Sequence, residues 1–122
     1  MSQDNPDIQE ILTTVKEFAE GVAGRSSGAE RYDALCAAFL MGVVQRELEF
    51  GEQQDDNQLA QLRDLLGKPG DLAELYQLFS KNVRDGGYDD DWQVAFDFAF
   101  GQVVDKVKVT NPNHLEAEHQ NN

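Results

Sequence analysis

Residues 34–44 form a run of eleven residues with no charge and no hydrogen-bonding side chain stronger than the thiol of Cys36. A surface helix is apolar along one stripe, whereas a helix that is apolar all round must be surrounded by other protein. At 1.5 Å per residue the run spans roughly 17 Å, far less than the about 30 Å core of a bilayer. The run therefore predicts a central, buried helix in an all-α protein.

Apolar residues at helical spacing, separated by capping residues and glycines, predict where the other helices lie. Asp4 or Asn5 is expected to cap the first helix, and Gly51 is expected to end the second. A polar linker is expected at 52–58. The expected helices are 6–24, 28–50, a short one at 59–66, 71–84 and 89–110.

No segment alternates between apolar and polar residues as a strand would. The predicted fold is a single-domain antiparallel bundle of four main helices plus one short helix, with the second helix (about 28–50) central and buried. Residues 1–112 are expected to form this bundle domain, and residues 113–122 a polar, disordered C-terminal tail.

The last predicted helix is apolar on more than one side. Its main stripe is expected to face inward, and Val94 and Phe98 lie off that stripe. A chain of this size cannot easily cover every apolar face, so the pattern predicts association with a partner protein or a second copy. The stripe consists of Trp92, Phe96, Ala99, Phe100, Val103, Val104 and Val107.

The charge balance narrows the range of partners. Ten Lys and Arg residues against 23 Asp and Glu residues give a net charge of −13. Such a surface repels phosphate and anionic lipid, so we expect no nucleic-acid partner and no membrane partner. A single cysteine, a polar acidic start and the lack of a long apolar segment favour a cytoplasmic location.

Residues for catalysis are scarce in the predicted helices. The only histidines, His114 and His119, lie in the predicted tail, so no Ser-His or Cys-His pair is expected in the helical body. The acidic residues between Asp85 and Asp91 do not have the spacing of a calcium loop. We therefore expect a protein that is not an enzyme, with no metal and no cofactor.

Four polar residues form the candidate binding site that the sequence suggests. Arg46 and Glu47 follow the apolar run, and Lys106 and Asn111 lie at the end of the last helix. Positive charge near a helix C-terminus stabilises by ~0.3–1 kcal/mol, which is one explanation of the two cations. The alternative is a partner site, or a site for an acyl or CoA-like anion beside a pocket among the aromatic residues of the last two helices.

Four short blocks, in this order and spacing, resemble a bacterial family of small helical proteins of unknown function. They are Arg-Glu-Leu-Glu-Phe-Gly at 46–51, Leu-Arg-Asp-Leu-Leu-Gly at 62–67, Val-Arg-Asp-Gly at 83–86 and the segment 104–112, which contains Lys-Val-Lys-Val and ends in Asn-Pro. The resemblance covers roughly residues 8–115. Its members are often encoded near acyl-CoA dehydrogenases and aminoglycoside-phosphotransferase-like kinases, which implies an accessory role in acyl-CoA or small-molecule catabolism.

The resemblance carries over to Arg46, Glu47, Lys106, Asn111 and Pro112. It fails in the second helix, where the family pattern has His, Arg and Asn. This chain has Asp33, Leu35 and Phe39 at those positions. A family site built on those polar residues is therefore expected to be lost or altered here, and the second helix is expected to be dry core.

Overall fold

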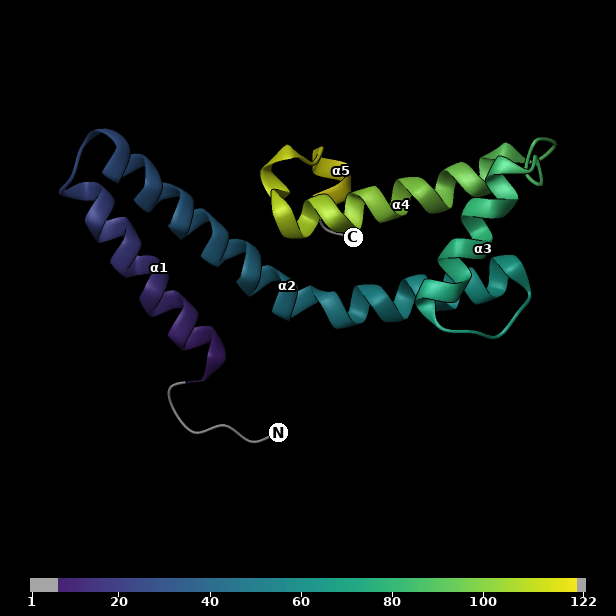
Figure 1. Ribbon diagram of the computed structural model, residues 1–122, viewed down its shortest axis with the longest axis horizontal. Helices are drawn as coiled ribbons and strands as arrows, with labels where there is room; N and C mark the ends of the chain where they lie inside the picture. Colours follow the sequence, from purple (N-terminus) through teal and green to yellow (C-terminus); the bar gives the residue numbers. More distant parts are fainter. Residues whose placement is uncertain (1–6, 121–122) are drawn as a thin grey trace. The chain divides into compact units, whose positions relative to one another are not determined.

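The computed structural model describes residues 7–120, and this part of the chain is helical without any strand (Figure 1). The predicted all-α class is therefore confirmed. The chain divides into two compact units, and the boundary between Glu49 and Phe50 falls inside one helix. The elements are α1 (Ile8–Gly24), α2 (Gly28–Leu66), α3 (Leu72–Arg84), α4 (Trp92–Thr110), the 3-10 helix η1 (Pro112–His114) and α5 (Ala117–Gln120).

Two helices begin at aspartates that cap them. The Asp7 carboxylate accepts a hydrogen bond from the Glu10 backbone N–H at 2.8 Å and so opens α1. The caps predicted for this helix, Asp4 and Asn5, lie outside the described residues. Asp71 opens α3 in a capping box with Glu74, as the spacing predicted. The helix α5 and the end of η1 lie in the stretch 113–122, which was expected to be disordered.

The predicted end of the second helix at Gly51, the linker at 52–58 and the separate short helix at 59–66 are wrong. The structure has one continuous helix, α2, of 39 residues. An interior glycine weakens a helix by roughly 1 kcal/mol relative to alanine but does not end it, and residues 52–58 contain no proline. The helix ends at Gly67, which has φ 66° and donates its backbone N–H to the Arg63 carbonyl at 2.8 Å.

In the first unit, α1 packs against the first half of α2 through small residues (Figure 1). Polar bonds fix the two helices in register: Gln45 donates to the Thr13 hydroxyl at 2.8 Å, and Arg31 donates to the Ala23 carbonyl at 2.7 Å. Small side chains let the two backbones approach closely. The buried residues are Ala19 and Ala23 of α1 and Ala34, Ala38 and Gly42 of α2.

The apolar run lies in the first unit, where α1 packs against it, and it is not buried throughout. Helix α2 contacts α1, α3 and α4, as a central helix should. However, Leu35, Phe39 and Leu40 are 45%, 50% and 56% exposed, so the expectation of a dry, fully buried run is wrong. The residues that α1 covers recur every four positions on one side of α2, and that side carries alanine and glycine. The large residues are consequently left on the other sides.

In the second unit, α2, α3 and α4 enclose an apolar core. Leu62 of α2 is fully buried, and Leu75, Phe79 and Phe98 surround it with 3–7% exposure. The Phe79 and Phe98 rings meet edge to face with centroids 5.0 Å apart. Offset and edge-to-face aromatic pairs add about 0.5–1.5 kcal/mol beyond the area they bury. This cluster is the main apolar core of the second unit.

A polar network at one edge of this core orients α4. The Tyr76 hydroxyl donates to the Gln58 side-chain oxygen, and Gln58 donates to the Asp105 carboxylate at 3.1 Å. Gln54 donates to the Asp105 backbone carbonyl at 3.0 Å. The two residues that α2 contributes, Gln54 and Gln58, belong to the segment 52–58 that was predicted to be a linker. The polar side chains of this segment therefore serve helix packing.

The phenol of Tyr76 links this network to pH. Burial is the main cause that raises the pKa of Tyr76 above its ordinary value, and the Asp55 and Asp105 carboxylates act in the same direction, while the Gln102 side chain opposes them. A raised folded-state pKa favours the protonated phenol in the folded protein. The contribution of the phenol to the free energy of unfolding is fully present below about pH 10, the ordinary pKa of tyrosine. It is lost as the pH rises through the raised pKa of Tyr76 in the folded protein.

Tyr76→Phe tests this linkage. The variant is expected to lose about 1 kcal/mol near pH 7, because the Gln58 oxygen loses its donor. Above pH 10 its free energy of unfolding should fall less steeply than that of the unchanged protein. Urea titrations at several alkaline pH values measure both effects. Equal slopes in the two proteins would show that Tyr76 does not carry the alkaline loss.

Candidate interaction surface

Helix α4 has two apolar faces, and the second unit buries Phe98, one of the two residues that the sequence pattern placed off the main stripe, while Val94, the other, is 37% exposed. Phe98 and Val109 are 7% and 4% exposed. The opposite face is open to solvent: Trp92 is 62%, Phe96 53%, Phe100 42% and Val103 58% exposed. We call these four residues the aromatic stripe. The prediction that they face inward is wrong.

The polar network explains why α4 turns its smaller apolar face inward. Asp105 lies on the Phe98 side of the helix, because residues seven apart share a face. Its bonds to Gln54 and Gln58 hold that side against α2. Turning the aromatic stripe inward would expose Phe98 and break these bonds. Periodicity grouped the stripe correctly, but hydrogen bonds to distant residues decided which face is covered.

The aromatic stripe is a continuous row of rings. Trp92 and Phe96 have ring centroids 6.1 Å apart at 75°, and Phe96 and Phe100 stack with centroids 5.8 Å apart at 19°. Neighbouring rings restrict each other's rotation, so less side-chain entropy remains to be lost when the row is covered. Large exposed apolar patches of this kind mark interaction sites.

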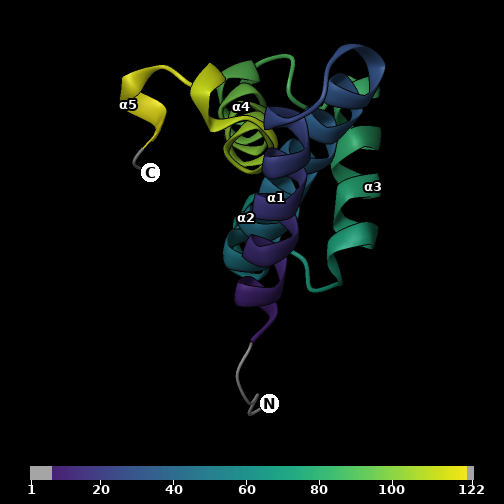
Figure 2. The same ribbon diagram turned by 90° about the vertical axis from the view of Figure 1, so that its left-hand side faces the viewer.

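The C-terminal segment reaches the end of this row. The His119 ring of α5 meets the Phe100 ring at a centroid distance of 5.3 Å. Viewed along α4, α5 and α3 lie on opposite sides of that helix (Figure 2). Helix α3 belongs to the core side, and α5 lies toward the stripe. Trp92 and Phe96, at the other end, keep more than half of their surface exposed.

Charges differ between the two ends of the stripe. Asp89, Asp90 and Asp91 precede its first ring, and Asp91 is the N-cap of α4, without a side-chain capping bond. Lys106 is exposed near the other end. Lys108 instead lies over the Phe50 ring, with its Nζ 5.4 Å from the centroid. The stripe is therefore an uncharged surface with an acidic end and a basic end.

The four residues of the predicted anion or partner site belong to two units. Arg46 and Glu47 lie on the part of α2 in the first unit, where a Cβ at Gly42 would be 3.2 Å from a terminal nitrogen of Arg46. Lys106 lies in the last turns of α4 and Asn111 is its C-cap, whose backbone N–H donates to the Val107 carbonyl at 2.7 Å. A site that joins all four remains a prediction.

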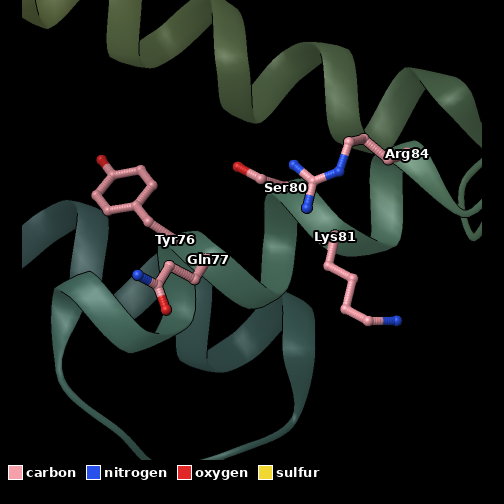
Figure 3. Close-up of a pocket in the computed structure, with 5 residues that line it drawn as sticks. All are labelled: Tyr76, Gln77, Ser80, Lys81 and Arg84. Carbon is pink, nitrogen blue, oxygen red and sulfur yellow. The ribbon is translucent and has the colours of Figure 1, made fainter.

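The aromatic residues of the last two helices do not form the ligand pocket that was the alternative prediction, because some are core and others are exposed. A different pocket lies beside Tyr76. Its walls come from α3 (Figure 3). Lys81 in this wall pairs with Asp85 at 2.5 Å. This pocket was not predicted, although the spacing of four residues between Tyr76, Ser80 and Arg84 places them on one side of the helix. The lining residues are Tyr76, Gln77, Ser80, Lys81 and Arg84.

Residues 7–120 contain neither a metal-ligand cluster nor a helix able to cross a membrane. Within that range, no three His, Cys, Asp or Glu side chains gather where they could hold a metal ion. His119 instead contacts Phe100 and lies 3.4 Å from the Glu118 carboxylate. In the same range, no helix has the length and apolar character needed to cross a membrane.

These features define an all-α protein whose most distinctive surface is an exposed aromatic helix face. The chain belongs to DUF6285, a domain of unknown function, whose family model matches residues 24–114. The resemblance noted from the four sequence blocks is thus confirmed at the level of a family of unknown function. No curated protein and no solved structure matches the chain.

Proposed function

We propose that this protein acts without catalysis, by binding a partner protein through the aromatic stripe of α4. The observation that carries this proposal is the exposure of Trp92, Phe96 and Val103, each more than half open to solvent. Tryptophan and phenylalanine are enriched in interface centres, and tryptophan is a frequent hot-spot residue. An uncharged row between an acidic and a basic end would also give a partner one preferred direction.

A partner-binding role fits the accessory role in acyl-CoA or small-molecule catabolism that the resemblance implies. An accessory subunit needs a surface for the enzyme it assists rather than catalytic groups of its own. We propose this as the context of the interaction. The partner would present an apolar patch with a basic group facing the Asp89–Asp91 end and an acidic group facing Lys106.

Site-specific photocrosslinking tests the proposal. A photoreactive phenylalanine analogue at Phe96 is expected to form a covalent adduct with another protein in cells that produce this chain naturally. The same analogue at Ala73, which is exposed on α3 and lies outside the pocket of that helix, is the matched control. Adducts several-fold stronger at position 96 support the stripe. Equal adducts at both positions, or none at position 96, would rule it out as the binding surface.

A second candidate function rests on the pocket of α3. Arg84 brings a cation to its wall near the Ser80 hydroxyl, while Lys81 points away from them and pairs with Asp85 (Figure 3). This is a suitable surface for a small anion, and a CoA-like phosphate is the proposed class. A ligand at 100 times its dissociation constant stabilises the folded protein by about 2.7 kcal/mol. A thermal-shift series with acyl-CoAs, repeated on Arg84→Ala, measures this, and no shift in the unchanged protein would exclude the candidate.

A further inference from the structure

The segment that follows α4 turns back along that helix. Pro112 disfavours helical angles at Asn111, which has φ −161° and ψ 77°, so α4 ends there. The His114 backbone N–H then donates to the Asn111 carbonyl at 3.0 Å and closes the turn. At 1.5 Å per residue, Asn111 lies about 17 Å beyond Phe100 along the helix axis. Because the His119 ring lies 5.3 Å from the Phe100 ring, the chain after the turn runs back toward the middle of α4.

This returning segment covers one end of the aromatic stripe. Phe100 is the least exposed of the four stripe residues, and its ring meets the His119 ring edge to face at 66°. The His119 side chain keeps only 27% of its surface exposed. Trp92 and Phe96, at the other end, are more than half open to solvent. The chain therefore holds part of its own candidate binding surface.

We propose that residues 115–120, which we call the strap, compete with the partner for the Phe100 end of the aromatic stripe. The inference rests on the proposed function and adds its regulation. The Trp92 end is open for the first contact with the partner. The Phe100 end becomes available when the strap swings away about the turn at Asn111 and Pro112.

The strap has the chemistry that the stripe is proposed to bind. It carries the His119 ring together with Glu116 and Glu118, and it contains no Lys or Arg. The proposed partner likewise places an apolar group on the stripe and an acidic group toward the basic end of Lys106. A short tether holds a competing segment at an effective concentration on the order of millimolar. The strap can therefore compete with a partner without binding tightly itself.

The ring contact is of a size that a partner can displace. One edge-to-face ring pair changes an equilibrium constant roughly 2- to 12-fold. Helix α5 has four residues, and helices this short do not persist in isolation. The contact of His119 with Glu118, at 3.4 Å, lies within the strap. Removing the His119 ring is therefore expected to favour the open strap by about the factor of one ring pair.

Proton NMR of the two histidine rings tests whether the strap is closed in solution. The His119 ring protons should be displaced by the ring current of Phe100, and Phe100→Leu should remove that displacement. His114, which is exposed in η1, is the internal reference and should keep its shifts. His119 shifts that do not respond to Phe100→Leu would overturn the inference.

Photocrosslinking from position 96 then tests competition in the full chain. With the partner limiting, His119→Ala should raise the yield of the adduct by up to roughly 12-fold, because it removes one ring pair from the closed state. His114→Ala is the matched control and should leave the yield unchanged. His119→Phe replaces the imidazole with a more apolar ring, so it should hold the strap closed and lower the yield.

The outcomes separate this inference from the proposed function. Equal adducts in His119→Ala and His114→Ala would overturn the strap and leave partner binding by the stripe in place. A lower yield in His119→Ala would also overturn it, because α5 would then be part of the binding surface. No adduct in any variant would overturn the proposed function, and the competition with it, even where NMR shows a closed strap.

Discussion

Phe98→Ala is expected to destabilise the protein by about 3–5 kcal/mol, whereas Phe96→Ala should change its stability by less than about 1 kcal/mol. Both substitutions remove the same ring from the same helix. Phe98 is 7% exposed and packs against Phe79 of α3. Phe96 is 53% exposed, and its ring contacts are with Trp92 and Phe100 of the same helix. The pair therefore measures directly which face of α4 is core.

Urea denaturation followed by circular dichroism gives both values. The sequence pattern taken alone predicts the reverse order, because it places Phe96 on the inward stripe and Phe98 off it. A larger loss for Phe96→Ala than for Phe98→Ala would mean that α4 is rotated and that the aromatic stripe is packed. Similar m-values are required, so that the comparison concerns stability and not a change in the unfolded state.

Asp56→Pro is expected to destabilise the protein by about 3 kcal/mol or more, because proline removes an interior backbone hydrogen bond and clashes with the preceding turn. Asp56 is exposed in the middle of the segment 52–58, which was predicted to be a linker. A linker would accept proline with little change. Asp56→Ala is the matched control and should be neutral or slightly stabilising, since alanine favours helix.

Urea denaturation followed by circular dichroism also tests the prediction for the Asp56 variants. Loss of helix content in Asp56→Pro together with a stable Asp56→Ala supports one continuous α2. If both variants are as stable as the unchanged protein, residues 52–58 are not helical and α2 ends near Gly51.

Most of the helices could be predicted from the sequence because their ends are local. The capping box of Asp71 and Glu74 and the glycine after Leu66 depend on neighbouring residues alone. The continuity of α2 could not be predicted in this way. Polar residues after Gly51 are typical of a loop, but Gln54 and Gln58 are polar because they bond Asp105, which is far along the chain.

Helices α4 and α2 show a second limit of prediction from the sequence, which concerns the face of a helix that is buried. Periodicity finds which residues share a face, but it does not reveal what covers that face. In α2 the covered side is the one with Ala34, Ala38 and Gly42, because small residues permit close helix contact. In α4 the covered side is fixed by the polar network. Counting large apolar residues therefore identified the wrong inward face of α4, and it predicted burial on all sides for a run of α2 that is covered on one side.

The candidate surfaces were only partly predictable for the same reason. The two-sided apolar character of the last helix predicted an interaction surface, and the structure identifies the aromatic stripe as the side open to solvent. The site of Arg46, Glu47, Lys106 and Asn111 remains a prediction. The pocket on α3 was not predicted, because the aromatic pattern groups Tyr76 with other rings, whereas the pocket is formed with Ser80 and Arg84, polar residues on the same face of the helix.

Acrylamide quenching of Trp92 tests the central claim most directly, because Trp92 is the single tryptophan of the chain. The claim is that the aromatic stripe is open to solvent and available to a partner. The purified protein should show the red-shifted emission and efficient quenching of an exposed indole throughout the micromolar range. A blue-shifted emission with weak quenching at every concentration would show that the stripe is already packed, and would contradict the claim.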